Sequence, residues 1–290
     1  PADPERTPGG SSSGSAAAVA DFHVPLALGS QTAGSILRPA SYCGVIGFKP
    51  TFGAIPLDGV LGQSPPLDTL GGYGRSMEDL ALLISVLSGA PVTLQPPRSL
   101  RLEFVKTLAW PQGDAEMRAA FEGLARRHRD VIVEVALPDA FEDTGGLQRA
   151  VQFRDIARAY GPIADAHPGV ISAKLKDVIA EGRTVSDAEY ERACGRREQL
   201  YRALEPVLHT FDAILTPAAT GIAPLGLGST GSPMFNFQWT YLGCPAISVP
   251  LLQVEGLPLG VQLVGARGRD GDLLSAARAA AEVLGAGADT

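Results

Sequence analysis

The sequence predicts a layered α/β fold, and three observations support this prediction. Short apolar runs alternate with segments of helical period along the 290-residue chain. The apolar runs are continuous rather than alternating with polar residues, which is typical of central strands covered on both faces. Apolar residues make up 45% of the chain and charged residues 19%, a balance that excludes intrinsic disorder and allows a sizeable core.

Expected strands and helices follow one another in chain order. Near the start, apolar runs at 24–29 and 43–53 indicate buried extended segments, and residues 76–89 have the period of an amphipathic helix. The later segments comprise strand-like runs at 100–106, 131–138, 212–217, 245–252 and 259–265, and helical segments at 116–128, 145–208 and 272–284.

Capping patterns set the limits of two of these helices. Ser76 is followed three residues later by Asp79, and Ser186 by Glu189, a spacing at which the hydroxyl can cap the first helical turn. Within 145–208, we expect breaks at Pro162 and at 167–169.

Composition excludes several classes of protein. The net charge of −7 and the pI of 5.2, with no basic block, argue against nucleic acid or an anionic membrane as the main partner. The three cysteines form no metal-binding pattern and are expected to be reduced. The longest apolar stretch is interrupted by Asp21 and Pro25, so neither a membrane span nor a signal peptide is predicted, and we expect a cytoplasmic protein.

Domain organisation is predicted to be simple. No internal repeat or sharp change in composition divides the chain, so residues 1–290 are expected to form one domain. The opening Pro-Ala-Asp-Pro-Glu-Arg-Thr-Pro resembles neither a strand nor a start signal, and we expect this domain to lack its N-terminal part.

The densest chemical signal is the segment PGGSSSGSAAAVA at 8–20, for which several interpretations compete. A phosphate-binding loop would need a Lys after Gly14 and a strand before Gly9, and neither is present. Gly10 to Gly14 matches GxSxG with Ser12 as a nucleophile, but no strand leads into the turn. A serine-rich turn that caps the following helix is also physically sound.

A second segment favours a further interpretation over these. LALGSQTAGSILRPASYCGVIGFKPTFG at 26–53 places Ser35 24 residues after Ser11. Together with GGSSSGSAAAV, this pattern resembles the amidase signature family, and the last third of the chain agrees with it. The closest likeness within the family is to the malonamidase E2 type. The resemblance implies a three-layer α/β/α fold around a mixed sheet, and an enzyme that cleaves the C–N bond of a small amide.

The resemblance also assigns roles to residues. Ser35 would be the nucleophile that forms an acyl-enzyme, and Ser11 would relay the proton of Ser35. A cis Gly10-Ser11 peptide bond would hold Ser11 in place, with Gly10 and Ser12 in support. The backbone N–H groups of Thr32, Ala33, Gly34 and Ser35 would form the oxyanion hole. Gln31 is a further candidate, as a substrate-binding residue or as a support for this loop.

Arg38 suggests the kind of substrate. It lies one position after the Arg of the common family pattern and matches the malonamidase-type position, where its planar guanidinium would pair with a substrate carboxylate. The implied substrate is a small carboxylate-bearing amide, such as a malonamate-like molecule. The alternative is a structural Arg that binds carbonyl groups of nearby loops.

The family pattern is incomplete in one respect. Its catalytic Lys lies several dozen residues before the GGSS motif, whereas ten residues precede Ser11 here, none of them Lys. Lys49 is expected to be structural. Two alternatives therefore stay open, a protein like the A-type component of a glutamyl-tRNA amidotransferase and an inactive remnant. No metal or organic cofactor is expected, and a homodimer is a candidate assembly.

Other residues are expected to be structural. Cys43 has no positive neighbour that would lower the pKa of its thiol, so it is predicted to pack in the core. Trp239 and Tyr241 either pack in the core or line the acyl pocket, and the sequence leaves both interpretations open.

Overall fold

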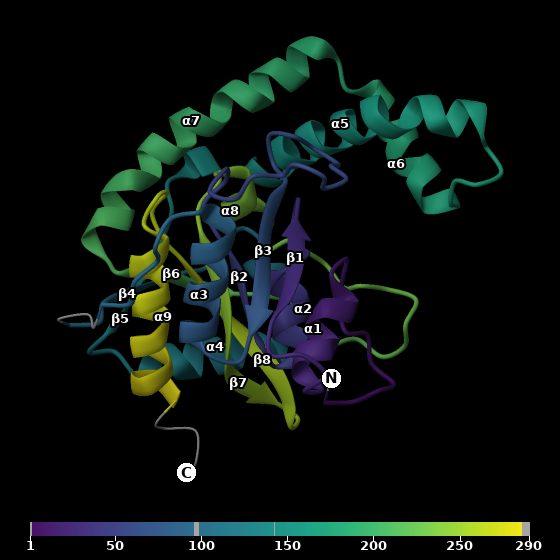
Figure 1. Cartoon of the computed structure of the whole chain (residues 1–290). Coiled ribbons are helices and arrows are strands. Elements are labelled where there is room, and N and C mark those ends of the chain that lie inside the picture. Colours follow the sequence, from purple (N-terminus) through teal and green to yellow (C-terminus); the bar gives the residue numbers. More distant parts are fainter. Residues whose placement is uncertain (1, 96–98, 142, 286–290) are drawn as a thin grey trace.

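The structure is a computed structural model that describes residues 2–95, 99–141 and 143–285. An eight-stranded sheet runs through its centre in the order β1-β3-β2-β7-β8-β6-β4-β5 (Figure 1). Strand β4 pairs in parallel with β5 and β6, and every other pair is antiparallel, so the sheet is mixed as expected. The strands are β1 Ala27–Gln31, β2 Ile46–Lys49, β3 Thr69–Gly74, β4 Leu102–Val105, β5 Ile132–Val135, β6 Ala213–Pro217, β7 Ala246–Val254 and β8 Leu257–Val264.

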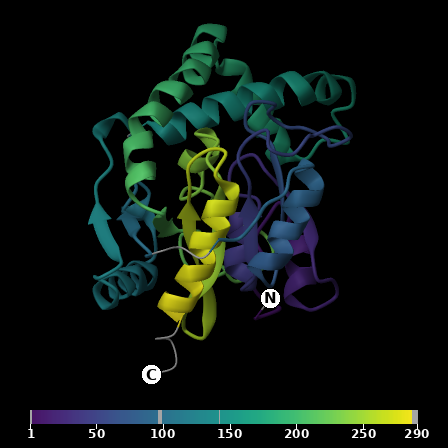
Figure 2. The same cartoon turned by 60° about the vertical axis from the view of Figure 1, so that its left-hand side comes forward.

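Helices cover both faces of this sheet, which gives the three layers. Leu102 and Phe104 of β4 pack in one core with α3, α4 and α9, whereas the neighbouring Val105 packs in a second core with α1, α2, α7 and α8. Figure 2 shows α3 and α9 on the same face of the sheet. The α-helices are α1 Ser13–Ala20, α2 Leu37–Cys43, α3 Met77–Ser88, α4 Ala115–Arg127, α5 Thr144–Ala166, α6 Ala173–Thr184, α7 Asp187–Thr210, α8 Phe237–Tyr241 and α9 Asp270–Gly285.

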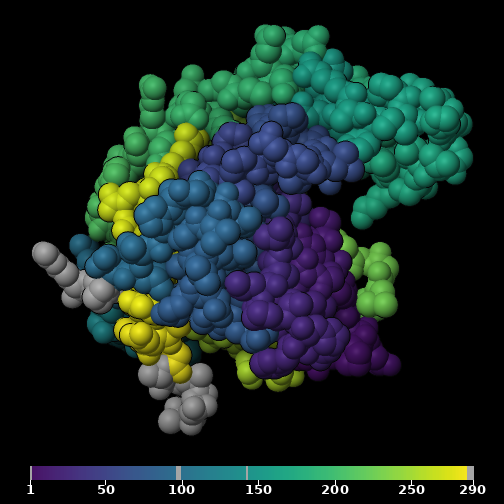
Figure 3. Space-filling model, viewed as in Figure 1, coloured from purple at the N-terminus to yellow at the C-terminus, as the bar shows by residue number. Residues whose placement is uncertain are grey.

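Three helices extend beyond the sheet. Helices α5, α6 and the first half of α7 form an arm, and α5 passes the end of the sheet at which β1 terminates (Figure 1). Figure 3 shows the arm projecting past the body, with a recess between it and the N-terminal segments. Since β1 leads directly into the segment that contains Ser35, the arm lies close to the predicted site.

Most elements agree with the sequence predictions. Ser76 Oγ accepts a hydrogen bond from the N–H of Asp79 at 3.1 Å, and Ser186 Oγ accepts one from Glu189 at 3.2 Å, so both predicted caps are confirmed. The break at Pro162 is wrong, because α5 continues to Ala166. Pro162 deprives the carbonyl of Arg158 of its helical donor, but both residues are exposed, so water can replace the lost bond.

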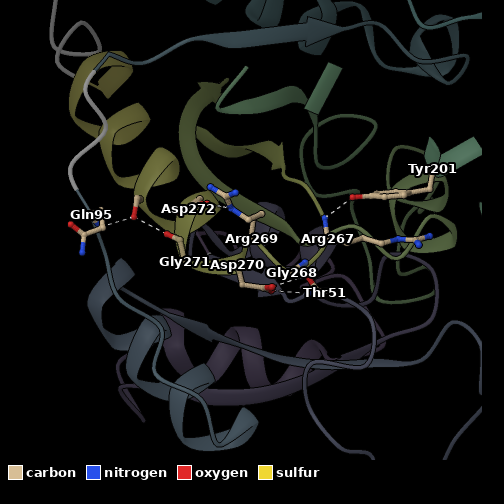
Figure 4. Close-up of polar contacts among 10 residues, drawn as sticks. Thr51, Gln95, Tyr201, Arg267, Gly268, Arg269, Asp270, Gly271 and Asp272 are labelled. Atoms are coloured by element: carbon tan, nitrogen blue, oxygen red, sulfur yellow. Dashed lines mark hydrogen bonds and ion pairs between the residues drawn. The ribbon is translucent and has the colours of Figure 1, made fainter. Parts of the chain in front are cut away.

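The start of α9 is tied to the segment after β2. Both carboxylate oxygens of Asp270 accept hydrogen bonds from Thr51, from its N–H at 2.7 Å and from its hydroxyl at 2.6 Å (Figure 4). The Thr51 hydroxyl in turn accepts from the N–H of Gly268 at 2.9 Å. A cavity of about 600 Å³ lies beside this turn, lined in part by Arg269 and Asp272, and none of the predicted site residues lines it. These contacts therefore join α9 to the sheet at a distance from Ser35.

Candidate functional site

Two loops meet where the sequence predicts the site. The peptide bond between Gly10 and Ser11 is cis, as expected from the resemblance. The N–H of Ser12 donates to the carbonyl of Ser35 at 3.4 Å, which joins the serine-rich loop to the segment after β1. Ser11 is exposed and Ser35 is half-buried. No hydrogen bond between their hydroxyl groups is present in the part of the chain that the structure describes.

The helix-capping interpretation of the serine loop is wrong. Ser12 occupies the N-cap position of α1, yet its side chain makes no capping hydrogen bond. Its hydroxyl instead donates to the carbonyl of Ser30 at 3.3 Å and accepts from the N–H of Ser30 at 3.2 Å. Ser12 thus fastens the loop to β1.

The backbone carbonyls of residues 32–35 are all engaged by the surrounding protein. Gln148 Nε2 donates to the carbonyl of Thr32 at 3.1 Å, and the Thr240 hydroxyl donates to that of Ala33 at 2.6 Å. The carbonyl of Gly34 accepts from the N–H of Arg38, and the carbonyl of Ser35 accepts from the Tyr73 hydroxyl. Four different elements therefore fix this short run of backbone.

The N–H groups of the same run have no partner. Among the residues that the structure describes, none accepts a hydrogen bond from the N–H of Thr32, Ala33, Gly34 or Ser35. In a trans peptide unit the carbonyl of one residue and the N–H of the next point in opposite directions. Fixing the carbonyls of Thr32, Ala33 and Gly34 therefore also orients the next three N–H groups. Adjacent oriented donors of this kind can bind an oxyanion.

Gly34 is required by close packing in this run. A Cβ atom built on Gly34 would overlap the side-chain amide of Asn236, and would lie 2.8 Å from Cβ of Pro233. Asn236 is itself fixed, because its Nδ2 donates at 3.1 Å both to the carbonyl of Ala218 and to Gln262 Oε1. A side chain at position 34 would therefore displace the backbone that carries the free donors.

Gln31 supports the loop rather than the substrate. Its side chain is fully buried, and its Oε1 accepts from the N–H groups of Ile36 at 2.8 Å and Leu37 at 3.1 Å. Its Nε2 donates to the Thr240 hydroxyl at 2.9 Å. Because these contacts occupy both ends of the amide, the expected substrate-binding role of Gln31 is corrected to a positioning role at the start of α2.

Arg38 is buried behind the serine loop. It is 4% exposed, and its Nη2 donates to the carbonyl of Gly10 at 2.6 Å and to the Thr230 hydroxyl at 3.4 Å. Its Nε and Nη1 have no hydrogen-bond partner among the described residues. Burial lowers the pKa of Arg38 from its usual value. The side chain therefore holds the Gly10 carbonyl and keeps two buried donors available, which makes an anionic partner favourable.

The other candidate residues are structural. Lys49 is fully buried and donates to the carbonyl of Pro50 at 2.8 Å, and burial lowers its pKa to about 8. Cys43 donates to the carbonyl of Pro8 at 3.4 Å, and burial raises its pKa to about 11, which leaves the thiol unreactive. Trp239 and Tyr241 are buried in the core between the sheet and α7.

Metal-binding clusters and membrane spans are missing from the described residues. These residues contain no group of three or more His, Cys, Asp or Glu side chains placed to hold a metal ion. Among the helices that the structure describes, none is both long enough and apolar enough to cross a membrane.

Several residues of the site have no signal in the sequence. Gln148, Thr240, Tyr73 and Asp68 contact residues 32–35 from α5, α8, β3 and the loop before β3. They lie between 36 and 207 positions along the chain from the residues they bind, and no motif spacing connects them. Only the fold brings these side chains to the run.

Comparison with known proteins gives a family and a set of relatives. A family model described as Amidase matches residues 1–274. The A subunit of the glutamyl-tRNA(Gln) amidotransferase of Methanothermobacter thermautotrophicus is 32% identical over 321 residues, which cover 96% of this chain and 68% of the relative. Its counterpart in Clostridium botulinum is 32% identical over 319 residues, which cover 91% of this chain and 65% of the relative.

Solved structures with a similar fold include an amidase. A crystal structure described as an amidase has a TM-score of 0.88 at 31% identity, covering 94% of this chain and 66% of that chain. A protein from a complex linked to the origins of an s-triazine catabolic enzyme has a TM-score of 0.87 at 27% identity, covering 98% of this chain and 68% of that chain. The chain thus spans about two thirds of the length of the proteins it matches.

Proposed function

The chain belongs to the amidase family, and from this premise we propose that Ser35 attacks the carbonyl carbon of an amide. The Ser35 Oγ–C bond forms, the C–N bond breaks, and the Ser35 proton passes through Ser11 to the departing nitrogen. Water then attacks the acyl carbon, the Ser35 Oγ–C bond breaks, and a proton from the water returns to Ser35 as the carboxylic acid leaves. The mechanism assigns no step to a metal or an organic cofactor.

One observation carries this proposal. The run 32–35 has every carbonyl engaged and every N–H free within the described structure, beside the hydroxyl of Ser35. Donors held in place before the reaction can stabilise the negative charge that develops on the carbonyl oxygen without having to reorganise. The bond from the N–H of Ser12 to the carbonyl of Ser35 brings the Ser11 segment next to Ser35, which supports a role for Ser11 in proton transfer.

Arg38 supports a substrate that carries a carboxylate. Its Nε and Nη1 are buried without a partner among the described residues, and a carboxylate could accept a charged hydrogen bond from either of them. Malonamate and glutamine both combine an amide with a carboxylate, but at different separations. Because the relatives include A subunits of glutamyl-tRNA(Gln) amidotransferase, the comparisons favour a glutamine-type amide over malonamate.

The substrate proposal is tested by comparing three amides. Hydrolysis of glutamine, malonamate and neutral propionamide is measured with the natural protein, Arg38→Ala and Arg38→Lys. We expect Arg38→Ala to lose about 10²-fold in kcat/KM on the carboxylate-bearing substrate, since a charged hydrogen bond disappears, and much less on propionamide. Arg38→Lys should recover part of the loss. An equal loss on all three amides would show that Arg38 only holds the Gly10 loop.

The assembly is tested separately. A component of an amidotransferase would purify with other proteins, whereas a simple amidase would form at most copies of itself. Affinity purification from the natural source, followed by mass spectrometry and light scattering, distinguishes the two. We expect a stable heteromeric complex if glutamine is the preferred amide. A homodimer that hydrolyses malonamate faster than glutamine would support the simple amidase instead.

A further inference from the structure

Two separate sets of hydrogen bonds connect helix α5 to Thr32, the first residue of the run 32–35. Thr32 is 8% exposed and lies where β1 ends. Its carbonyl is bound by Gln148, and its hydroxyl is linked to Asp155 through Asp68 and through the backbone N–H and hydroxyl of Ser64. Gln148 and Asp155 are two turns apart on α5, so both routes end on the same helix.

The direct route fixes one peptide plane. Gln148 Nε2 donates to the Thr32 carbonyl at 3.1 Å and also to Gln152 Oε1 at 2.9 Å, and Gln148 is fully buried. The plane that contains this carbonyl also contains the N–H of Ala33. Any rotation of the carbonyl away from Gln148 would therefore turn the N–H of Ala33 away from the position at which it faces a substrate.

The indirect route passes through two buried carboxylates. The Thr32 hydroxyl donates to Asp68 Oδ1 at 2.5 Å. Asp68 Oδ2 accepts from the N–H groups of Gln63 at 2.6 Å and Ser64 at 2.9 Å, so the carboxylate is held by three donors. The Ser64 hydroxyl then donates to Asp155 Oδ2 at 2.7 Å.

Burial strengthens this series of hydrogen bonds. Ser64 is fully buried, Asp68 is 8% exposed and Asp155 is 6% exposed, so little water reaches the bonds to compete with them. Hydrogen bonds to a charged acceptor are shorter and stronger than neutral ones, and in a low-dielectric interior they strengthen one another. A loop held only by packing would not need two carboxylates in its interior, since burying charge is costly.

We propose that Asp68 and Gln148 are positioning residues that set the direction of the oxyanion-hole N–H groups through Thr32, so that the arm helix α5 controls the competence of the site. This inference rests on the proposed function of Ser35. Neither residue touches the reacting atoms. Each acts by holding a peptide unit in the orientation that the transition state needs.

The test compares kcat and KM of the natural protein with those of five separate variants. They are Asp68→Asn, Thr32→Val, the double variant Asp68→Asn/Thr32→Val, Thr32→Ser and Gln148→Glu. Asp68→Asn presents an amide where a carboxylate accepts three hydrogen bonds, and Thr32→Val removes the hydroxyl at nearly constant shape. Each single variant except Thr32→Ser should lower kcat by about 10- to 100-fold, with KM changed less than about threefold. The double variant should lose no more than the worse single one, and Thr32→Ser should keep near-natural kcat.

A matched control comes from the next strand. Thr69 is also buried, but among the described residues its hydroxyl donates only to the carbonyl of Leu67 at 3.2 Å, within its own turn. Thr69→Val should lower stability without a specific fall in kcat. If Asp68→Asn fails to fold, Thr32→Val alone decides the question, because thermal melting of that variant should show a folded protein.

A second readout separates this inference from the proposed function. A phosphonofluoridate reacts with an activated serine: the Oγ–P bond forms, the P–F bond breaks, fluoride and the serine proton leave, and the phosphoryl oxygen enters the oxyanion hole. Absence of labelling at Ser35 in the natural protein contradicts the proposed function. Labelling at Ser35 that is equally fast in the natural protein, Asp68→Asn and Thr32→Val overturns the positioning role and leaves the proposed function intact. We expect labelling to slow in parallel with kcat.

Discussion

At the scale of single residues, Gln31 illustrates how one fully buried side chain can join several elements around the candidate site. Its amide accepts from the first N–H groups of α2 and donates to Thr240, which in turn binds the carbonyl of Ala33. The start of a helix leaves several N–H groups unsatisfied, and here the residue at the end of β1 satisfies two of them. The same side chain thereby joins β1, α2 and α8 around the run that ends at Ser35.

Gln31→Leu should therefore reduce both stability and turnover. The substitution leaves the N–H groups of Ile36 and Leu37 buried without an acceptor, and we expect the free energy of unfolding to fall by about 2–4 kcal/mol. Urea denaturation followed by circular dichroism measures this change. Gln253→Leu is the matched control, since Gln253 is exposed on β7 and its replacement should change stability by less than about 0.5 kcal/mol. Equal effects of the two substitutions would contradict the account of Gln31.

Residue-scale prediction from the sequence succeeded for motif residues and failed for their supports. The motifs at 8–20 and 26–53 predicted that the Ser11 and Ser35 segments meet, and the structure confirms the cis bond and the contact between Ser12 and Ser35. The roles of Ser11 and Ser35 themselves stay predictions. Gln148 and Asp68 could not be predicted, because hydrogen bonds between distant segments leave no periodic pattern in the sequence.

At the scale of elements, the strands with continuous apolar runs were predictable and β3 was not. Its sequence, TLGGYG, has few of the β-branched and apolar residues that mark a buried strand, yet it lies between β1 and β2. A Cβ atom on Gly72 would overlap the side chain of Leu83 and lie 2.8 Å from the carbonyl oxygen of Ala27. The glycines of β3 thus reflect close packing of neighbouring elements, which only the folded structure reveals.

Gly72→Ala should accordingly destabilise the protein by about 1–3 kcal/mol, as overpacking of a well-filled site does. Gly195→Ala provides the opposite case. Gly195 is exposed within α7, and beyond its chain neighbours and the adjacent helix backbone no described atom lies within 4 Å of a Cβ atom placed there, so alanine should stabilise the helix by about 0.5–1 kcal/mol. Thermal unfolding of the two variants should shift in opposite directions. A stabilising Gly72→Ala would show that β3 has room which the structure does not indicate.

At the scale of the whole molecule, the sheet and the arm each position a different part of the candidate site. The mixed sheet fixes the positions of β1 and β3, and the arm helix α5 contacts the run that follows β1. The layered α/β class was predictable because covered strands are uniformly apolar. The arm was not: the helical period of 145–208 predicts helices, but nothing in it indicates that α5 places Gln148 against the end of β1.

Stability of the whole molecule should depend on pH through Glu103. This side chain in β4 is fully buried, its two carboxylate oxygens have no partner among the described residues, and burial raises its pKa to about 7. The pKa of a Glu side chain in the unfolded protein is about 4.3, so between about pH 4.3 and pH 7 the folded state holds a proton on Glu103 that the unfolded state releases. The contribution of Glu103 to stability is therefore favourable at low pH and is lost as pH rises through about 7.

Glu103→Gln tests this pH dependence. The variant should be more stable than the natural protein at pH 8, by on the order of 2 kcal/mol, and should differ little at pH 4. Urea unfolding at several pH values measures the difference between the two proteins. A constant difference from pH 4 to pH 8 would show that Glu103 does not titrate in this range.

The central claim, that Ser35 forms an acyl-enzyme beside the free N–H groups of its own loop, is tested most directly by trapping that intermediate. The natural protein is mixed with its amide substrate, quenched in acid within milliseconds to seconds, digested, and analysed by mass spectrometry. The acyl group should be found on the peptide that contains Ser35 and should be absent in Ser35→Ala. Amide hydrolysis that persists in Ser35→Ala, or an acyl group attached to another serine such as Ser11, would contradict the account.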